Sequence, residues 1–329
     1  MRLEKLKQLK KLFVKNNKIL DEIVYHGNNV NFDRNYENWI LEPLIPYEAI
    51  TILDGLGGSG KTWFAIDLSY AISMNTNFLG KYPVKQSGTV LYVTAEEVPY
   101  TFVKRVDRFE ETYGSNDNFR WWSTLHRNYP HGSPLLQKRW AITKTRTAED
   151  LEYLIDKHKP ILVILDSMIN FYGLNENETS EAIVFYEMLK EWIKTYKCSF
   201  LLLHHQNKES MKSNDNEGIF RGSTVFREQA RERITYKSVK LENNKIVKRI
   251  NIEKVNYYSP LLEEFPIYLQ FNKGIHTYDE KLNNQLKLQE EDRDRDKDKG
   301  KKNSNVTSAK KNKQKEEKVE SLKSLGKFF

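Results

Sequence analysis

The chain has 329 residues, of which 39% are hydrophobic and 30% are charged, and its formal net charge is +8. This length is enough for one large α/β domain with appendages, and the mildly basic charge is compatible with a nucleic-acid partner. No apolar run approaches the roughly 18 residues that crossing a membrane requires, and the charged start MRLEKLKQLKK does not resemble a signal peptide. We therefore expect a cytoplasmic protein without a membrane partner.

Residues 1–36 are expected to form an N-terminal helical segment. Over residues 1–24, apolar side chains recur at steps of three and four, which is typical of an amphipathic helix with a lysine-rich polar face. Such a helix packs on the core or on a neighbouring subunit, or else its basic face meets a nucleic acid or a membrane surface. The sequence leaves these interpretations open.

The stretch 49–62, AITILDGLGGSGKT, has the order of a phosphate-binding P-loop. A short β-branched run is followed by G-x-x-x-x-G-K-[ST] and then by WFAIDLSYAIS, which has helical apolar spacing. Backbone N–H groups of such a loop and the helix N-terminus bind phosphate, the lysine reaches the β- and γ-phosphates, and the Thr hydroxyl holds Mg²⁺. The residues expected to bind ATP are Gly55, Gly57, Gly58, Ser59, Gly60, Lys61 and Thr62.

Strands and helices alternate after the P-loop. Further strands are predicted at 88–95, 161–165 and 199–203, and helices at 99–113, 147–157 and 180–196. This alternation indicates a mostly parallel sheet that helices cover on both faces. Alternating patterns at 232–241, 246–258 and 264–271 predict a terminal antiparallel set of strands, so that the α/β core spans residues 37–278.

Carboxylates follow two of the predicted strands, at the sheet edge where parallel sheets bind ligands. Asp166 follows ILVIL, the pattern of a Walker B strand, and is expected to hold Mg²⁺ opposite Thr62. Glu96 and Glu97 end the strand after the P-loop helix, where a carboxylate can deprotonate the water that attacks the γ-phosphate. We favour Glu96 as the base, although both glutamates would also suit the start of the next helix.

The fourth strand ends at His204, His205 and Gln206. A neutral donor at this edge can sense the γ-phosphate, or the histidines can be structural. Because adjacent strand residues point to opposite faces, the pair is poorly placed to chelate a metal.

A polar loop and a basic cluster come next. The loop carries Lys208 and Lys212 among Ser, Asn and Gly, which suits contacts to a nucleic-acid backbone but also an ordinary flexible loop. An arginine of the cluster from Arg221 to Arg231 could reach a neighbouring subunit's γ-phosphate as an arginine finger, or the cluster could be a solvated surface.

Residues 279–329 are expected to be a disordered tail, since they are rich in both charges and lack an apolar face. The tail ends in LKSLGKFF, which resembles a sliding-clamp-binding peptide of the form Q-x-x-L-x-x-F-F. The residues that would bind the clamp are Leu322, which stands in the place of the glutamine, and Leu325, Phe328 and Phe329. A chance apolar terminus is the alternative interpretation.

Several segments together resemble the RepA-like hexameric replicative helicases, which are RecA-type ATPases related to DnaB and KaiC. The segments are WILEPLIP, GLGGSGKT, TAEE, ILVILDS, LLLHHQNK, RGSTVFREQAR and IEKVNYYSP, within residues 37–278. The resemblance implies a RecA-like core, a homohexameric ring with ATP between subunits, and translocation on single-stranded DNA. It also implies that Glu96 is the catalytic glutamate, Asp166 the Walker B aspartate, His205 the sensor and Arg231 the finger. The chain departs from the family in reading AEE where AED is common.

Two functional hypotheses follow. The first is an ATP-driven, ring-forming DNA motor, a replicative helicase of a plasmid, virus or other mobile element. The second is a regulatory or accessory ATPase in replication or recombination that does not unwind DNA. Stimulation of ATP hydrolysis by single-stranded DNA would distinguish them.

Overall fold

The computed structural model of the protein describes residues 37–206 and 225–290. All of these except Glu37 belong to one compact unit, which begins at Asn38. Several predictions lie outside the described residues: the N-terminal helix, the loop lysines Lys208 and Lys212, and the C-terminal peptide.

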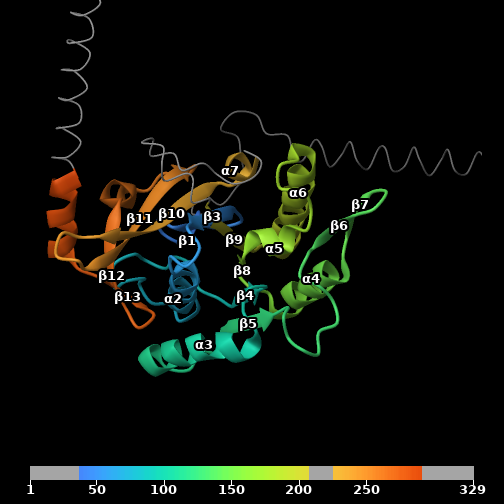
Figure 1. Ribbon diagram of the computed structural model, residues 1–329, viewed down its shortest axis with the longest axis horizontal. Coiled ribbons are helices and arrows are strands. Elements are labelled where there is room, and N and C mark those ends of the chain that lie inside the picture. Colours follow the sequence, from blue (N-terminus) through green and yellow to red (C-terminus); the bar gives the residue numbers. More distant parts are fainter. Residues whose placement is uncertain (1–36, 207–224, 291–329) are drawn as a thin grey trace, which may run out of the picture. The chain divides into compact units, whose positions relative to one another are not determined.

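A nine-stranded sheet forms the centre of the described chain, in the order β13-β12-β11-β10-β3-β9-β8-β4-β5 (Figure 1). The six strands from β10 to β5 are parallel, and β11, β12 and β13 extend the sheet in antiparallel fashion. The parallel strands are Ile50–Gly55 (β3), Val90–Thr94 (β4), Phe119–Ser123 (β5), Leu162–Asp166 (β8), Ser199–His205 (β9) and Glu232–Lys240 (β10). The antiparallel strands are Ile246–Val255 (β11), Ile267–Asn272 (β12) and Ile275–Tyr278 (β13). The mostly parallel sheet and the terminal antiparallel strands are confirmed.

Helices cover both faces of this sheet, as the alternation of elements predicted. Lys61–Ser73 (α2) and Pro99–Tyr113 (α3) lie on one face. Arg146–His158 (α4), Met168–Tyr172 (α5), Thr179–Tyr196 (α6) and Val225–Gln229 (α7) lie on the other. Because strand residues alternate in direction, Leu53 faces α2 whereas the adjacent Ile52 faces the opposite cluster.

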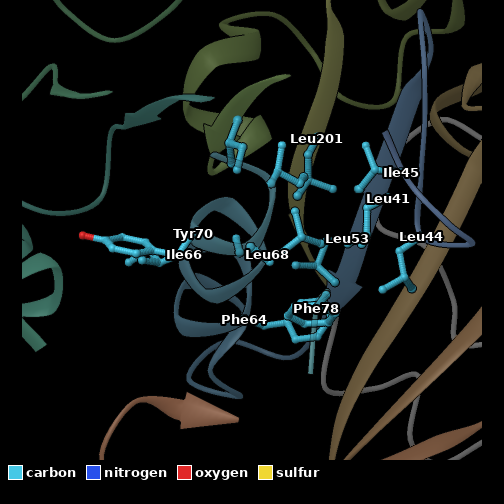
Figure 2. Packing of buried hydrophobic residues seen from close by; sticks show 14 of the residues in the cluster. Leu41, Leu44, Ile45, Leu53, Phe64, Ile66, Leu68, Tyr70, Phe78 and Leu201 are labelled. Atoms are coloured by element: carbon cyan, nitrogen blue, oxygen red, sulfur yellow. The ribbon is translucent and has the colours of Figure 1, made fainter. Parts of the chain in front are cut away.

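The helix that follows the P-loop is the most deeply buried helix of the first face. Figure 2 shows Phe64, Leu68 and other α2 side chains directed toward Leu53 of β3 and Leu201 of β9. A small two-stranded sheet, Trp39–Leu41 (β1) with Ile45–Pro46 (β2), packs on the same cluster. This burial fixes α2, and with it the loop that precedes it, against the sheet.

A second two-stranded sheet, a 3₁₀ helix and one further helix complete the described chain. Leu136–Lys138 (β6) pairs with Ile142–Lys144 (β7), and a short 3₁₀ helix, η2, spans Pro260–Glu264. Residues 280–290 form a further helix. Among the described residues, no helix combines the length and the apolar character needed to cross a bilayer.

The helix at 280–290 corrects the expected start of the tail at residue 279. Leu282 and Leu286 are four residues apart and therefore share one helical face, which packs against Val247 and Tyr268. The buried side chain of Asn283 accepts a hydrogen bond from the Tyr268 backbone N–H at 2.6 Å and donates one to the Tyr268 carbonyl at 2.8 Å. The high charge of the surrounding sequence concealed this short apolar face.

Candidate active site

The P-loop connects the carboxyl end of β3 to the first turn of α2. Gly60 precedes the helix with φ = +105°, a left-handed conformation that favours glycine, and α2 has no side-chain cap at its N-terminus. At Gly55, a Cβ atom would collide with the Tyr236 carbonyl of β10, so the close approach of the two backbones also requires glycine. The uncapped helix N-terminus provides backbone N–H groups and a positive partial charge for a phosphate.

Lys61 is buried and turns back onto its own loop. Its ammonium group donates to the Gly55 carbonyl at 2.8 Å and the Leu56 carbonyl at 3.0 Å, and lies 3.1 Å from Nδ1 of His205. Burial lowers the pKa of Lys61, although the carboxylates of Asp166, Asp54 and Glu96 oppose this effect. The lysine is therefore already placed at the loop whose N–H groups would receive the phosphates.

Thr62 and Asp166 lie together, as predicted. The Thr62 hydroxyl donates to Asp166 Oδ2 at 2.9 Å, and the hydroxyl of Tyr92 on β4 donates to the same oxygen at 2.6 Å. Burial raises the pKa of Asp166 to about 6, although the hydrogen bonds from Tyr92 and Thr62 oppose the rise. A hydroxyl beside a buried carboxylate is an oxygen donor set that fits Mg²⁺, so these residues could hold the ion.

Glu96 connects to Lys61 through His205. The Nε2 atom of His205 lies 2.8 Å from Glu96 Oε1. Because the Lys61 ammonium can only donate, Nδ1 of the imidazole accepts from it, and the ring proton is on Nε2 and is donated to Glu96. This hydrogen bond lowers the pKa of Glu96; burial opposes it, and the charge of Lys61 contributes to the lowering. The result is a hydrogen-bonded chain from the P-loop lysine to a carboxylate.

Glu97 is directed to a different partner. Both of its carboxylate oxygens accept from Nε of Arg105 on α3, at 3.0 and 2.9 Å, and Nη2 of Arg105 also donates to Oε1. The Ser123 hydroxyl donates to the Glu97 carbonyl at 2.6 Å. The structure thus separates two adjacent glutamates that the sequence left as alternatives, and only Glu96 faces the P-loop.

His204 points away from His205, as expected for neighbours in a strand. Its Nδ1 lies 3.2 Å from Asp54, a fully buried residue at the end of β3. Asp54 also accepts from Arg233 of β10 at 2.6 Å and from Gln206 at 2.9 Å. Burial would raise the pKa of Asp54, but the bonds and charges of His204 and Arg233 together hold it below the ordinary value. In the described chain, no three His, Cys, Asp or Glu side chains form a metal cluster.

Lys248 is a site residue that sequence reasoning missed. This buried lysine of β11 donates to the Ser59 carbonyl in the P-loop at 2.7 Å and to the Ser238 hydroxyl at 2.9 Å. Its ammonium group also lies over the rings of Tyr236 and Phe271, at 5.7 and 5.1 Å from their centroids. Burial lowers the pKa of Lys248. A lysine inside an alternating strand resembles any solvent-facing residue, so no sequence signal could have found it.

Arg231 is not part of this cluster. Its side chain is exposed, and its backbone N–H donates to the Ile50 carbonyl at 2.9 Å. Ile50 begins β3, whereas the P-loop follows the last residue of that strand, Gly55. At roughly 3.3 Å per strand residue, Arg231 and the P-loop lie at opposite ends of the parallel strands.

These features define a P-loop nucleotide-binding protein: a buried strand, a glycine loop, an uncapped helix and a hydroxyl–carboxylate pair on the neighbouring strand. Residues 26–211 match the model of the AAA domain family, and the chain belongs to this family of P-loop ATPases. The match includes the P-loop, Glu96, Asp166 and His205 and ends before Arg231. No curated protein matches the chain.

Proposed function

We propose that the protein is an ATP-driven, ring-forming motor on single-stranded DNA, a replicative helicase of a plasmid, virus or other mobile element. The observation that carries the catalytic part of this proposal is the chain Lys61–His205–Glu96 beside the Thr62–Asp166 pair. The resemblance of the motifs to RepA-like helicases supports the mechanical part.

In this proposal, Glu96 orients and deprotonates the water that attacks the γ-phosphate. Its lowered pKa keeps the carboxylate ionised and able to accept a proton. Lys61 leaves the Gly55 and Leu56 carbonyls to bind the phosphates. His205 touches both residues and therefore transmits the presence of phosphate to the segment that follows β9. A magnesium ion between Thr62 and Asp166 would neutralise charge on the phosphates.

Arg231 is proposed to complete the site of a neighbouring subunit. Its exposed side chain lies at the opposite end of β3 from the P-loop of its own chain, so it cannot serve its own phosphates. An arginine supplied in trans stabilises the charge that develops during phosphoryl transfer. This position supports a closed homo-oligomer, for which we propose a hexamer with head-to-tail interfaces.

The test is ATP hydrolysis by the purified chain with and without single-stranded DNA, over a series of salt concentrations, together with unwinding of a tailed duplex. We expect DNA to stimulate hydrolysis and added salt to weaken the stimulation. Lys61→Ala should abolish both hydrolysis and unwinding. If DNA does not change the rate of hydrolysis and no duplex is unwound, the motor proposal is wrong and the protein is a regulatory or accessory ATPase.

The C-terminal residues Leu322, Leu325, Phe328 and Phe329 are proposed to dock on a sliding clamp. A short apolar peptide on a charged tail would insert its aromatic side chains into a pocket of the clamp. Replacing Phe328 and Phe329 with alanine should abolish capture by an immobilised clamp and leave ATP hydrolysis unchanged. If the immobilised clamp captures the wild type and the double-alanine variant equally, these residues do not bind a clamp.

A further inference from the structure

The β6–β7 hairpin exposes an aromatic side chain at its tip. Leu136 pairs with Lys144 and Lys138 with Ile142, and the turn between the strands contains Arg139 and Trp140. Trp140 is 102% exposed, the largest exposure among the large hydrophobic residues of the described chain. Figure 1 shows the two strands near α6, with their turn pointing away from the central sheet.

The base of this hairpin is fixed on the segment that follows the Walker B strand. The Leu135 N–H donates to the Phe171 carbonyl at 2.7 Å, and Leu135 and Leu136 are buried. A Cβ atom at Gly173 would lie 2.5 Å from Pro134 and still closer to the Leu136 carbonyl, so the two backbones are in close contact. The backbone that presents Trp140 is therefore fixed at its base, so less backbone entropy remains to be lost when the tip binds a partner.

This anchoring also joins the hairpin to the ATP site. The segment it rests on, α5 with Gly173 at its end, begins two residues after Asp166. The Walker B strand and the base of the hairpin are therefore connected by one short helix.

Among the described residues, Arg139 is the only positively charged side chain of the hairpin that has no ion-pair partner. Lys138 forms an ion pair with Glu181, and Lys144 forms one with Glu152 at 3.0 Å. The Arg139 side chain is exposed and has no hydrogen bond or ion pair within residues 37–206 and 225–290. One free guanidinium is therefore adjacent in sequence to one free indole ring.

This combination fits a single-stranded nucleic acid better than a protein surface. Around Trp140, Gln137, Arg139 and Thr143 are exposed and polar or charged, Ala141 is exposed but small, and Ile142 is half-buried against the core. Trp140 is therefore the only large apolar side chain that the described residues of the hairpin expose. A protein interface buries a core of several apolar side chains. An isolated ring beside an arginine instead offers one stacking face and one phosphate contact.

We propose that the β6–β7 hairpin binds single-stranded DNA, with Trp140 stacked on a base and Arg139 on a phosphate. This inference rests on the proposed function as a DNA motor. It gives the motor a base-stacking contact with DNA, which Lys208 and Lys212 cannot provide. In this proposal, DNA binding at the hairpin is linked through α5 to Asp166 at the end of the Walker B strand.

The experiment measures the affinity of the full-length chain for a fluorescent oligo(dT) strand at several salt concentrations. Trp140→Ala should weaken binding between about fivefold and 150-fold at every salt concentration, because one stacked base is lost. Trp140→Phe should retain most of the affinity, whereas Trp140→Leu, which is apolar but cannot stack, should behave like alanine. Arg139→Gln should reduce the salt slope by about 0.7, the value for one phosphate contact to a single strand.

Tyr258→Ala is the matched control, since Tyr258 is also largely exposed but lies after β11. It should bind DNA as the wild type does, and the thermal unfolding of each variant reports whether it is folded. Unchanged affinity in Trp140→Ala, while DNA still stimulates hydrolysis by the wild type, would overturn the hairpin contact and leave the motor intact. A wild type that neither binds DNA nor responds to it would overturn both.

A second copy of the chain is the other possible occupant of the tip, and sedimentation of the same variants tests it. If Trp140→Ala is dissociated while Trp140→Leu keeps the oligomeric state of the wild type, Trp140 is an interface residue and the proposed DNA contact is wrong. If all variants keep the oligomeric state of the wild type, the affinity differences belong to the DNA.

Discussion

Adjacent residues in this site have different partners, and the difference decides what each can do. Glu96 reaches His205 and through it the P-loop lysine, whereas Glu97 is held by the guanidinium of Arg105. Both carboxylate oxygens of Glu97 are engaged by Arg105 on α3, whereas the carboxylate of Glu96 faces the P-loop, where the attacking water would lie. The geometry therefore favours Glu96 for general-base chemistry.

Exchanging either glutamate for glutamine tests this assignment. We expect Glu96→Gln to lower kcat for ATP hydrolysis by about 10²- to 10⁴-fold, the usual contribution of a general base, while ATP still binds. Glu97→Gln is the matched control and should have a much smaller effect. Steady-state hydrolysis and equilibrium nucleotide binding give the two readouts, and equal losses of kcat in both variants would contradict the assignment.

A third glutamate, Glu232 of β10, is buried without a charged or hydrogen-bonding partner for its side chain among the described residues. Neither of its carboxylate oxygens has a hydrogen-bond partner in the described chain, and burial raises the pKa of this carboxyl well above its ordinary value. The folded state therefore keeps the carboxyl protonated, whereas the unfolded chain releases the proton above about pH 4.3. Folding stability from this group is present at low pH and is lost as the pH rises.

Glu232→Gln removes this titration. We expect the free energy of unfolding of the variant, relative to the wild type, to increase with pH above about 5, by at most about 1.4 kcal/mol per pH unit. Denaturant unfolding of both proteins between pH 5 and 8 measures the difference, and all other groups cancel in the comparison. Parallel stability curves would show that Glu232 does not titrate as the burial indicates.

At the scale of elements, the antiparallel strands do more than extend the sheet. Lys248 of β11 holds the Ser59 carbonyl of the P-loop. The hydroxyl of Tyr236 on β10 pairs with Nε2 of His276 on β13 at 2.8 Å, and Nδ1 of His276 pairs with Asp67 of α2 at 3.0 Å. Strands from the C-terminal part of the chain thus fix both the phosphate loop and the helix that follows it.

Replacing Lys248 with methionine should loosen the loop while keeping most of the side-chain volume. A hydrogen bond from a charged group contributes about 1.5–3 kcal/mol, so we expect the Kd for ATP to rise about tenfold or more, with a smaller change in kcat. Lys245→Met is the control, because Lys245 is an exposed lysine in the turn before β11. If the Kd is unchanged in a folded Lys248→Met protein, the contact between Lys248 and the P-loop does not contribute to ATP binding.

At the scale of the molecule, the P-loop site of one chain brings together every proposed catalytic group except Arg231. The P-loop and Arg231 lie at opposite ends of the same parallel strands. A head-to-tail ring brings these two ends together on neighbouring copies.

Mixing two inactive variants tests this arrangement. Lys61→Ala and Arg231→Ala should each abolish hydrolysis, yet their equimolar mixture should regain activity. Random assembly would pair an intact Lys61 with a neighbour's intact Arg231 at roughly a quarter of the interfaces. Hydrolysis of the mixture is compared with that of each variant alone, and a mixture as inactive as its components would show that Arg231 does not act in trans.

The sequence by itself determined the parts that depend on neighbouring residues. The P-loop, the alternation of strands and helices, and the polar strand ends at Glu96, Asp166 and His205 could all be predicted. Each depends on local spacing or on the rule that parallel strands end at one edge. The boundary of the tail was missed, because two leucines in a charged context give little periodic signal.

Only the tertiary structure decided which side chains meet. Tyr92 of β4 and Arg233 of β10 meet Asp166 and Asp54 on the strands beside them in the sheet, β8 and β3. Lys248 reaches the P-loop from β11, one strand beyond β10, and in all three pairs the partners are far apart in the chain. The choice between Glu96 and Glu97 likewise depended on the position of Arg105 on α3. Contacts of this kind follow from strand order and register, and these are fixed by the packing of the whole core rather than by any local pattern.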